Sequence, residues 1–244
     1  MKICVIVPVY NSENHIVDVI RSVLQYTETL IVVNDGSTDG TMEVLRATPL
    51  RKKIELVFYA KNRGKGYALQ QGFRLALQLG VTHAITLDAD GQHLASDIPV
   101  LVQKATENPE ALIVGARKFD NPNMPRGNIF ANKFSNFWFM VQTGRKLPDT
   151  QTGFRVYPLQ KMRRIRLFTN RYEAELELLV RSAWRNVQLV SQAINVYYPP
   201  KSERLSHFKS CRDFFRISVL NIALCFCAVV WGYPIMLLRK IFTA

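Results

Sequence analysis

The chain has 244 residues and a hydrophobic content of 48%, which suits one large α/β domain with a full core and leaves room for an appendage. Its four cysteines have no metal-ligand spacing, which argues against a zinc site and indicates reduced, cytosolic usage. The net charge of +13 is uneven, because residues 1–115 hold only 11 of the 32 basic residues but 12 of the 19 acidic ones. This asymmetry favours an anionic partner such as a membrane surface or a phosphorylated substrate; no nucleic-acid-binding module is recognisable, and a solvated basic face is the alternative.

The first 115 residues alternate apolar runs with amphipathic stretches. The apolar runs predict buried strands at Ile3–Val9, Leu30–Val33, Ile54–Tyr59, His83–Leu87 and Ala111–Gly115. Helices are expected between them, from Asn11 or Ser12 to about Tyr26, up to about Arg46, over Tyr67–Leu79, and from Ser96 or Asp97 to about Thr106. Strands that alternate with helices in this way predict a parallel, doubly wound sheet.

The pattern changes after Arg117. Helices are expected at Asn128–Thr143 and Tyr172–Trp184, and strand-like pieces at Val187–Val190 and Ile194–Tyr197. Glu173 and Glu175 fall in the first turn of the second helix, where they either favour the helix N-terminus or belong to an active site.

The last apolar segment, Ile217–Leu238, holds no charge over 22 residues and is long enough to cross a bilayer. Asn221 is polar, and Pro234 is expected to kink a helix there. Basic residues flank the segment at Lys209, Arg212, Arg216, Arg239 and Lys240. The segment is therefore a membrane span, an interfacial helix pair broken near Gly232, a helix packed on a partner membrane subunit, or a buried soluble helix.

The central motif is the strand His83–Leu87 followed by Asp88-Ala89-Asp90-Gly91-Gln92. Ligands of open α/β sheets bind outside the carboxyl ends of the strands, where Asp88 and Asp90 are expected to project. Two carboxylates this close repel each other unless a cation lies between them, and Mg²⁺ or Mn²⁺ prefers such oxygen ligands together with substrate phosphates. The alternative is a turn with solvated acids.

Two further loops carry polar residues at strand ends. Asp35 and Asp39 lie in the turn after the second predicted strand, where they could be ordinary turn residues. Arg63 and Lys65 lie among glycines before a helix N-terminus, an arrangement that suits a phosphate but is weak evidence by itself.

Taken together, these residues resemble glycosyltransferase family 2. The matching motifs are Ile6-Val7-Pro8-Val9-Tyr10-Asn11, Val33-Asn34-Asp35-Gly36-Ser37-Thr38-Asp39-Gly40-Thr41, Asn62-Arg63-Gly64-Lys65-Gly66 and Leu87-Asp88-Ala89-Asp90-Gly91-Gln92-His93, in the family's order and spacing. The segment Asp149–Arg155 and the apolar tail are more narrowly similar to polyprenyl-phosphate sugar transferases of the dolichyl-phosphate mannose or glucose synthase type. Asn34 departs from the family, since many members carry a second acid there.

The resemblance implies a GT-A fold with a doubly wound mixed sheet. It implies a glycosyltransferase domain over residues 1–206, with a nucleotide-binding half (1–115) and an acceptor half (116–206), and a membrane-associated helical tail over 207–244. The implied reaction is metal-dependent and inverting: a sugar moves from a nucleotide-diphosphate donor to a polyprenyl phosphate at the cytoplasmic face of a membrane.

The family's site residues carry over to this sequence in three groups. Those matching the nucleotide-sugar site are Pro8, Tyr10, Asn11, Asp35, Asp39, Arg63, Gly64, Lys65, Asp88, Ala89 and Asp90. Those matching the Mg²⁺ or Mn²⁺ ligands are Asp88, Asp90 and Gln92. Arg117 and Arg155 match positions that face the acceptor phosphate, and the basic residues Arg126 and Arg204 are expected to help hold it.

Two other functions remain open at this stage. A phosphate acceptor is already ionised at neutral pH and needs no base, whereas a hydroxyl acceptor on a lipid or polysaccharide needs one, and Asp149 is then the best candidate. A catalytically inactive, basic membrane-surface protein is the third possibility, against which the intact Asp88, Asp90 and Gln92 argue.

Overall fold

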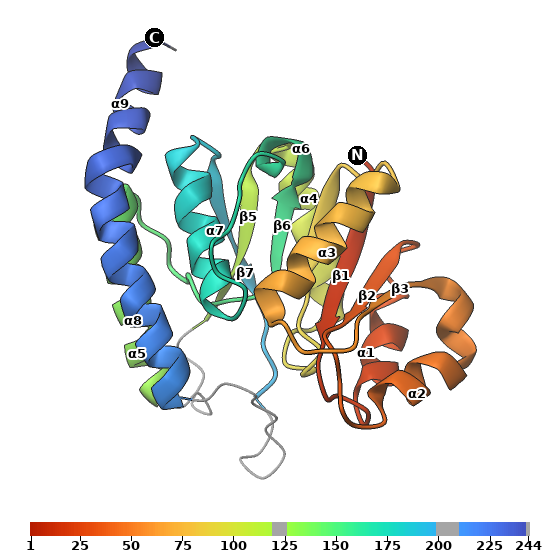
Figure 1. Ribbon diagram of the computed structural model, residues 1–244. Helices are drawn as coiled ribbons and strands as arrows, with labels where there is room; N and C mark the ends of the chain where they lie inside the picture. The colour runs from red at the N-terminus through yellow and green to blue at the C-terminus, as the bar shows by residue number, and fades with distance from the viewer. Residues whose placement is uncertain (119–125, 199–209, 243–244) are drawn as a thin grey trace.

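The computed structural model describes residues 1–118, 126–198 and 210–242 (Figure 1). Within them, a seven-stranded mixed sheet has the order β3-β2-β1-β4-β6-β5-β7. The strands are β1 (Ile3–Val9), β2 (Leu30–Asn34), β3 (Ile54–Phe58), β4 (His83–Thr86), β5 (Leu112–Arg117), β6 (Arg155–Pro158) and β7 (Leu189–Ile194). Strands β1 to β4 pair in parallel, as do β5 and β7, while β6 is antiparallel to both β4 and β5.

Helices cover both faces of the sheet, so each face has its own core. The helices are α1 (Ile16–Val23), α2 (Thr41–Ala47), α3 (Lys65–Gln78), α4 (Ile98–Glu107), α5 (Arg126–Thr143), α6 (Leu159–Met162), α7 (Glu173–Trp184), α8 (Ser210–Cys227) and α9 (Tyr233–Phe242). Alternate residues of β1 point to opposite sides: Cys4 and Ile6 pack with α3 and α7, while Val5 and Val7 pack with α1 and α4. The expected doubly wound mixed sheet is thus confirmed.

Two predictions for the second half were wrong in detail. Strand β6 was not expected, because its four residues include Arg155 and Pro158 and form no apolar run; pairing on both edges buries all four. In place of the two pieces expected at Val187–Val190 and Ile194–Tyr197, one strand, β7 (Leu189–Ile194), lies between them and pairs along its whole length with β5. The alternation of strands and helices predicted a parallel sheet. The strands on each side of β6 do pair in parallel with one another, but β6 itself is antiparallel to both of its neighbours.

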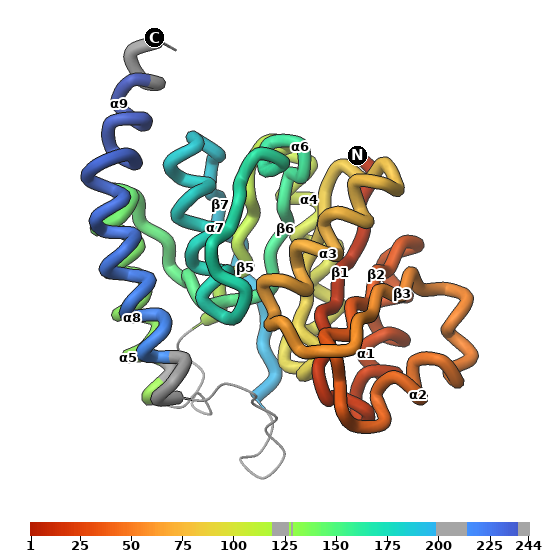
Figure 2. Tube along the Cα trace, viewed as in Figure 1, coloured from red at the N-terminus to blue at the C-terminus, as the bar shows by residue number. Residues whose placement is uncertain are grey.

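The C-terminal segment packs against the domain along α5 and α7 (Figure 2). Helices α8 and α9 are joined by a π-helical turn, η4 (Ala228–Gly232), which lies where Pro234 was expected to cause a kink. Leu220, Leu224 and Ala228 belong to the same buried cluster as residues of α7. The boundary expected near residue 206 lies outside the described residues.

Gly66 tests the contact between α3 and α7. A Cβ atom on Gly66 would lie 2.2 Å from the Cβ of Ala174, so Gly66→Ala should lower the free energy of unfolding by about 1–3 kcal/mol. Gly127, in α5, has no atom within 4 Å of such a Cβ, and Gly127→Ala should leave stability unchanged or raise it by up to about 1 kcal/mol. Urea denaturation measures both, and a Gly66→Ala variant as stable as wild type would contradict this packing.

Candidate active site

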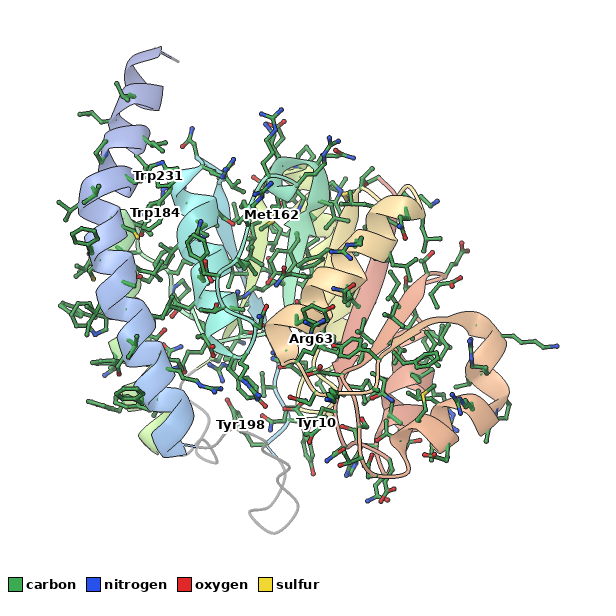
Figure 3. All side chains as sticks on the ribbon, viewed as in Figure 1. Tyr10, Arg63, Met162, Trp184, Tyr198 and Trp231 are labelled. Atoms are coloured by element: carbon green, nitrogen blue, oxygen red, sulfur yellow. The ribbon has the colours of Figure 1, made fainter. Side chains whose placement is uncertain are left out.

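The residues predicted to bind the donor lie together at one edge of the sheet. They come from the carboxyl ends of β1, β2 and β4 and from the loop before α3: Pro8, Tyr10, Asn11, Asp35, Asp39, Arg63, Gly64, Lys65, Asp88, Ala89 and Asp90. Figure 3 labels Tyr10 and Arg63 at this edge, together with Tyr198 from the segment after β7. The structure thus brings four sequence motifs to one place, as expected for an α/β sheet.

Asp35 shapes the loop that precedes α3. Its buried carboxylate accepts hydrogen bonds from the backbone N–H groups of Arg63 and Gly64, both at 2.8 Å, and from Asn62 Nδ2 at 2.9 Å. Gly64 has φ +102°, and a Cβ there would lie 2.5 Å from the carbonyl oxygen of Asn170, so only glycine fits. Asp35 is therefore a positioning residue for this loop.

Asn11 and Asp39 join the neighbouring turn to α2. Asn11, with φ 49°, accepts a 2.8 Å hydrogen bond from the backbone N–H of Thr38. Asp39 accepts hydrogen bonds from the backbone N–H groups of Thr41, at 3.0 Å, and Glu13, at 3.3 Å. Burial raises the pKa of Asp39, but these hydrogen bonds outweigh it and keep the pKa below its ordinary value.

Lys65 lies between two acidic residues. Its Nζ is 2.7 Å from Asp88 Oδ1 and 2.7 Å from Glu175 Oε2, and all three side chains are largely buried. Burial lowers the pKa of Lys65, but the two carboxylates outweigh this and raise it, so the ammonium stays charged. Gly153 makes room for the group, since a Cβ there would lie 2.7 Å from both Asp88 and Lys65 Nζ.

Arg117 and Asp149 form a second ion pair. Asp149 is fully buried, and it accepts bonds from Arg117 Nε at 2.7 Å and Nη2 at 3.0 Å. Asn132 Nδ2, at 2.6 Å, and the backbone N–H of Gln151, at 3.0 Å, also donate to this carboxylate. This bidentate pair fixes the guanidinium at the end of β5.

Arg155 does not fit the acceptor role expected for it. It is fully buried in β6, where Nη1 donates to the carbonyl oxygen of Glu175 and Nη2 to that of Thr150, both at 2.9 Å. These contacts tie β6 to α7 and to the preceding loop, so the residue is structural. Of the other expected acceptor residues, Arg204 and the side chain of Arg126 lie outside the described part of the chain.

The model of glycosyl transferase family 2 matches residues 4–166 of the chain, which contain all of these motifs except Glu175. The chain belongs to glycosyl transferase family 2.

Two relatives of this glycosyltransferase carry names that state an activity. It is 28% identical to a UDP-N-acetylglucosamine–dolichyl-phosphate N-acetylglucosaminyltransferase of Methanococcus voltae, over 73% of this chain and 78% of the relative. It is 27% identical to a dolichyl-phosphate β-glucosyltransferase of Trichomonas vaginalis, over 89% and 74% of the two chains.

A solved structure shows the same fold. Glucosyl-3-phosphoglycerate synthase of Mycobacterium tuberculosis, in complex with Mn²⁺, uridine diphosphate and glucosyl-3-phosphoglycerate, superimposes with a TM-score of 0.66 at 18% identity, over 93% of this chain and 79% of the other. The GT-A fold of the glycosyltransferase is thus confirmed.

Asp88 and Asp90 are the residues after β4 that could hold a divalent cation, and the described residues contain no cluster of three or more His, Cys, Asp or Glu side chains. Lys65 and the other nearby cations lower the pKa of Asp88 despite its burial, so this carboxylate stays ionised. Burial and the negative charge of the neighbouring Asp88 raise the pKa of Asp90 to about 6. A bound cation would relieve this repulsion, and Gln92 lies close by, with its backbone N–H 3.0 Å from Asp90 Oδ1.

The sequence did not predict site roles for two residues, Glu175 and His93. Glu175 was left open between a helix-end role and a site role, and its contact with Lys65 places it in the site. His93 lies near Thr152 and against Phe154, and burial lowers its pKa to about 4, so its ring is neutral. Neither contact could be predicted from the sequence. Glu175 in α7 is distant in sequence from Lys65, and the loop before β6 is distant in sequence from His93.

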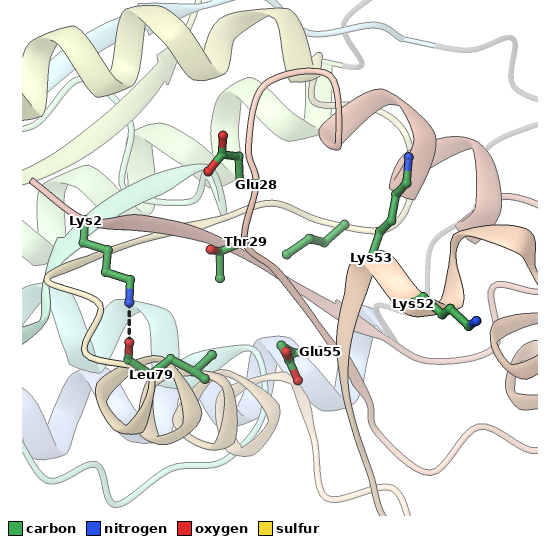
Figure 4. A pocket seen from close by; sticks show the side chains of 8 residues that line it. Lys2, Glu28, Thr29, Lys52, Lys53, Glu55 and Leu79 are labelled. Atoms are coloured by element: carbon green, nitrogen blue, oxygen red, sulfur yellow. Dashed lines mark hydrogen bonds between the residues drawn. The ribbon is translucent and has the colours of Figure 1, made fainter.

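The hollow in Figure 4 lies at the opposite edge of the sheet. Its volume is about 260 Å³, and it contains none of the motif residues. Lys2 and Glu28, from the start of β1 and the loop before β2, line it, and Lys2 Nζ donates to the carbonyl oxygen of Leu79. The chemistry of the family motifs therefore does not lie in this hollow.

Asp90→Asn tests the repulsion between the carboxylates of Asp88 and Asp90. A raised pKa means that the folded protein binds this proton more tightly than the unfolded chain does, so Asp90 contributes stability below about pH 4 that is lost as the pH rises to about 6. Without metal, Asp90→Asn should be more stable than wild type at pH 7, by on the order of 1–3 kcal/mol, and equal to it near pH 4.

Thermal melts with and without Mn²⁺ measure both effects. Mn²⁺ should raise the melting temperature of the wild-type protein and of Asp18→Asn, a change at an exposed carboxylate, but not that of Asp90→Asn. An Asp90→Asn variant that gains as much stability from Mn²⁺ as wild type does would contradict the assignment.

Proposed function

We propose that the protein is a metal-dependent, inverting glycosyltransferase that moves a sugar from a nucleotide-diphosphate donor to a polyprenyl phosphate. The names of these two relatives support a lipid-phosphate acceptor. The Mn²⁺ and uridine diphosphate of the solved structure support the donor and the metal. The observation that carries the proposal is the state of Asp149, the candidate base for a hydroxyl acceptor, whose oxygens accept hydrogen bonds from Arg117 and Asn132.

The donor would bind along the carboxyl edge of β1, β2 and β4. Asp88 and Asp90, with Gln92, would hold Mg²⁺ or Mn²⁺, and the bound cation supplies neutralisation of the charge that develops on the departing diphosphate. Lys65 presents a second, fixed positive charge beside Asp88. The loop ordered by Asp35 would bring its backbone and Arg63 next to the nucleotide.

The acceptor side favours a phosphate over a hydroxyl. A general base needs an available lone pair, but Arg117, Asn132 and Gln151 occupy the oxygens of Asp149. An ionised phosphate needs no base and instead needs a cation that orients it against the anionic donor. Arg117, held rigidly by Asp149 at the end of β5, is suited to that task.

The basic second half and the apolar tail agree with a lipid substrate. We place the site on the cytoplasmic face, because nucleotide sugars are cytosolic. An inactive surface protein would not need the intact cluster of Lys65, Asp88, Asp90 and Glu175.

The direct test compares two acceptors. With Mn²⁺ and a panel of radiolabelled nucleotide-diphosphate sugars, the full chain should label polyprenyl phosphate and leave the matching polyprenol unlabelled. Asp88→Asn should lose at least a hundredfold in turnover, since it removes a ligand of the cation that stabilises the transition state. Labelling of the polyprenol alone would establish the hydroxyl-acceptor alternative, and no labelling by folded protein with any donor would favour an inactive protein.

Arg117→Lys tests the acceptor site separately. Lysine cannot keep the bidentate pair with Asp149, so the apparent KM for lipid phosphate should rise about tenfold, or turnover should fall, while donor affinity changes less than twofold. Arg145→Lys is the matched control, because Arg145 also makes two hydrogen bonds but binds Val187 and Asn186 away from the motifs. An equal loss of donor affinity would place Arg117 in the donor site instead.

A further inference from the structure

The C-terminal apolar helix could cross a membrane by length alone. Within the described residues, Phe214–Leu238 forms a continuous stretch of 25 residues with a mean hydropathy of 2.0. Its most apolar window is only 22% buried inside the protein. Most of this surface therefore needs a partner other than water.

The helix is nevertheless fixed to the catalytic domain by polar contacts. Gln142 of α5 is fully buried, and its Nε2 donates to Asn221 Oδ1 at 2.9 Å. Trp184 of α7 donates to the carbonyl oxygen of Gln142 at 2.8 Å, and Tyr233 donates to that of Val141 at 2.5 Å. The Gln142–Asn221 bond joins two buried side chains across the contact, and because buried polar groups are costly to leave unpaired, it specifies one docked position.

Apolar contacts accompany the polar ones along the same length. Leu220, Leu224 and Ala228 repeat at a spacing of four residues and are buried against the domain. One turn later, Gly232 lies so close to Trp184 that a Cβ would be 2.5 Å from the indole nitrogen (Figure 3). The contact therefore continues over at least three helical turns.

A helix docked in this way cannot also cross a bilayer. Its neighbour α7 would have to enter the hydrocarbon with it, and α7 carries the buried ion pair of Glu177 and Arg181. Figure 1 shows the same arrangement, with α8 and α9 running lengthwise along the side of the domain. The apolar stretch is therefore long enough to cross a bilayer, but its packing against the side of the domain prevents it from doing so.

Helix α5 and the C-terminal helix both expose apolar side chains. Phe134 of α5 and Phe214 of α8 join them, with ring centroids 5.9 Å apart. The exposed large apolar residues of α5 and of the C-terminal helix include Phe137, Phe214, Ile222, Phe226, Val230 and Leu237. We call this set the apolar face.

The charges of the chain favour a lipid surface over a second copy as its occupant. Basic residues lie in sequence at both ends of the helix, with Arg216 near the start and Arg239 and Lys240 near the end. Pairing two such helices, in either direction, would bring basic ends together. An anionic bilayer surface would instead attract both ends, because apolar side chains with basic flanks are the signature of an interfacial helix.

We propose that the C-terminal helix lies in the plane of an anionic membrane surface, as the outer layer of the catalytic domain, and does not cross the membrane. Helix α8 begins at the same edge of the molecule as the carboxyl ends of the strands, so the active site opens beside the lipid headgroups (Figure 1). The proposal depends on the docked helix and not on the proposed reaction, and it is tested without donor or acceptor.

Vesicles without substrate provide the test. The full chain with a protease-cleavable C-terminal tag is added to preformed vesicles of phosphatidylcholine, alone or with about 30% phosphatidylglycerol as the anionic lipid. It should float with the anionic vesicles at least tenfold better than with the neutral ones. Added protease should remove the tag completely, and alkaline carbonate should release the protein. A tag that stays protected, with carbonate-resistant protein, would establish a span and overturn the proposal.

Two sets of variants separate the apolar face from the docked face. Phe226→Ser combined with Val230→Ser changes exposed positions, and it should reduce flotation at least tenfold without lowering the melting temperature. Asn221→Leu removes the partner of Gln142, so it should lower the melting temperature and leave flotation unchanged. The proposal would be contradicted if Asn221→Leu bound the membrane more strongly than wild type. It would also be contradicted if the wild-type protein formed a stable dimer and did not bind vesicles.

Discussion

The site depends on one ammonium group placed between two carboxylates. Lys65 Nζ contacts Asp88 after β4 and Glu175 in α7, each at 2.7 Å, and buried charges are tolerated only when they are paired in this way. Glycines at positions 64, 66 and 153 let the backbone approach closely enough for the pair to form. The ion pair thus joins residues 1–115 to the second half of the chain, and Asp88 and Asp90 beside it are the proposed ligands of the cation.

Helix α5 links the active site to the C-terminal helix. Near its start, Asn132 donates to Asp149, which holds Arg117 at the end of β5. Near its end, Gln142 bonds to Asn221 of α8. One rigid helix therefore sets both the position of the proposed phosphate ligand and the docking of the apolar helix, so an acceptor with a phosphate head and a hydrocarbon chain would meet both surfaces.

Much of the nucleotide half could be predicted from the sequence, because its strands are apolar runs and its motifs are local. Strand β1 matches its prediction at both ends, and the acids of the Asp88 motif lie at the predicted strand end. The second half could not be predicted as well. Strand β6 has no pattern of its own, and the burial of Arg155 depends on carbonyl groups brought by α7 and by the preceding loop. Glu175 likewise has a partner 110 residues away in the sequence.

The central claim is that the carboxyl edge around Asp88 binds a cation and a nucleoside diphosphate together. Titration calorimetry with a panel of nucleoside diphosphates, with and without Mn²⁺, tests it most directly. The account predicts that at least one diphosphate binds in the presence of Mn²⁺, and that affinity falls at least tenfold without the metal or in Asp88→Asn, but not in Glu173→Gln, a change at another buried acid of α7. Equal affinity with and without metal, together with full binding by Asp88→Asn, would contradict it.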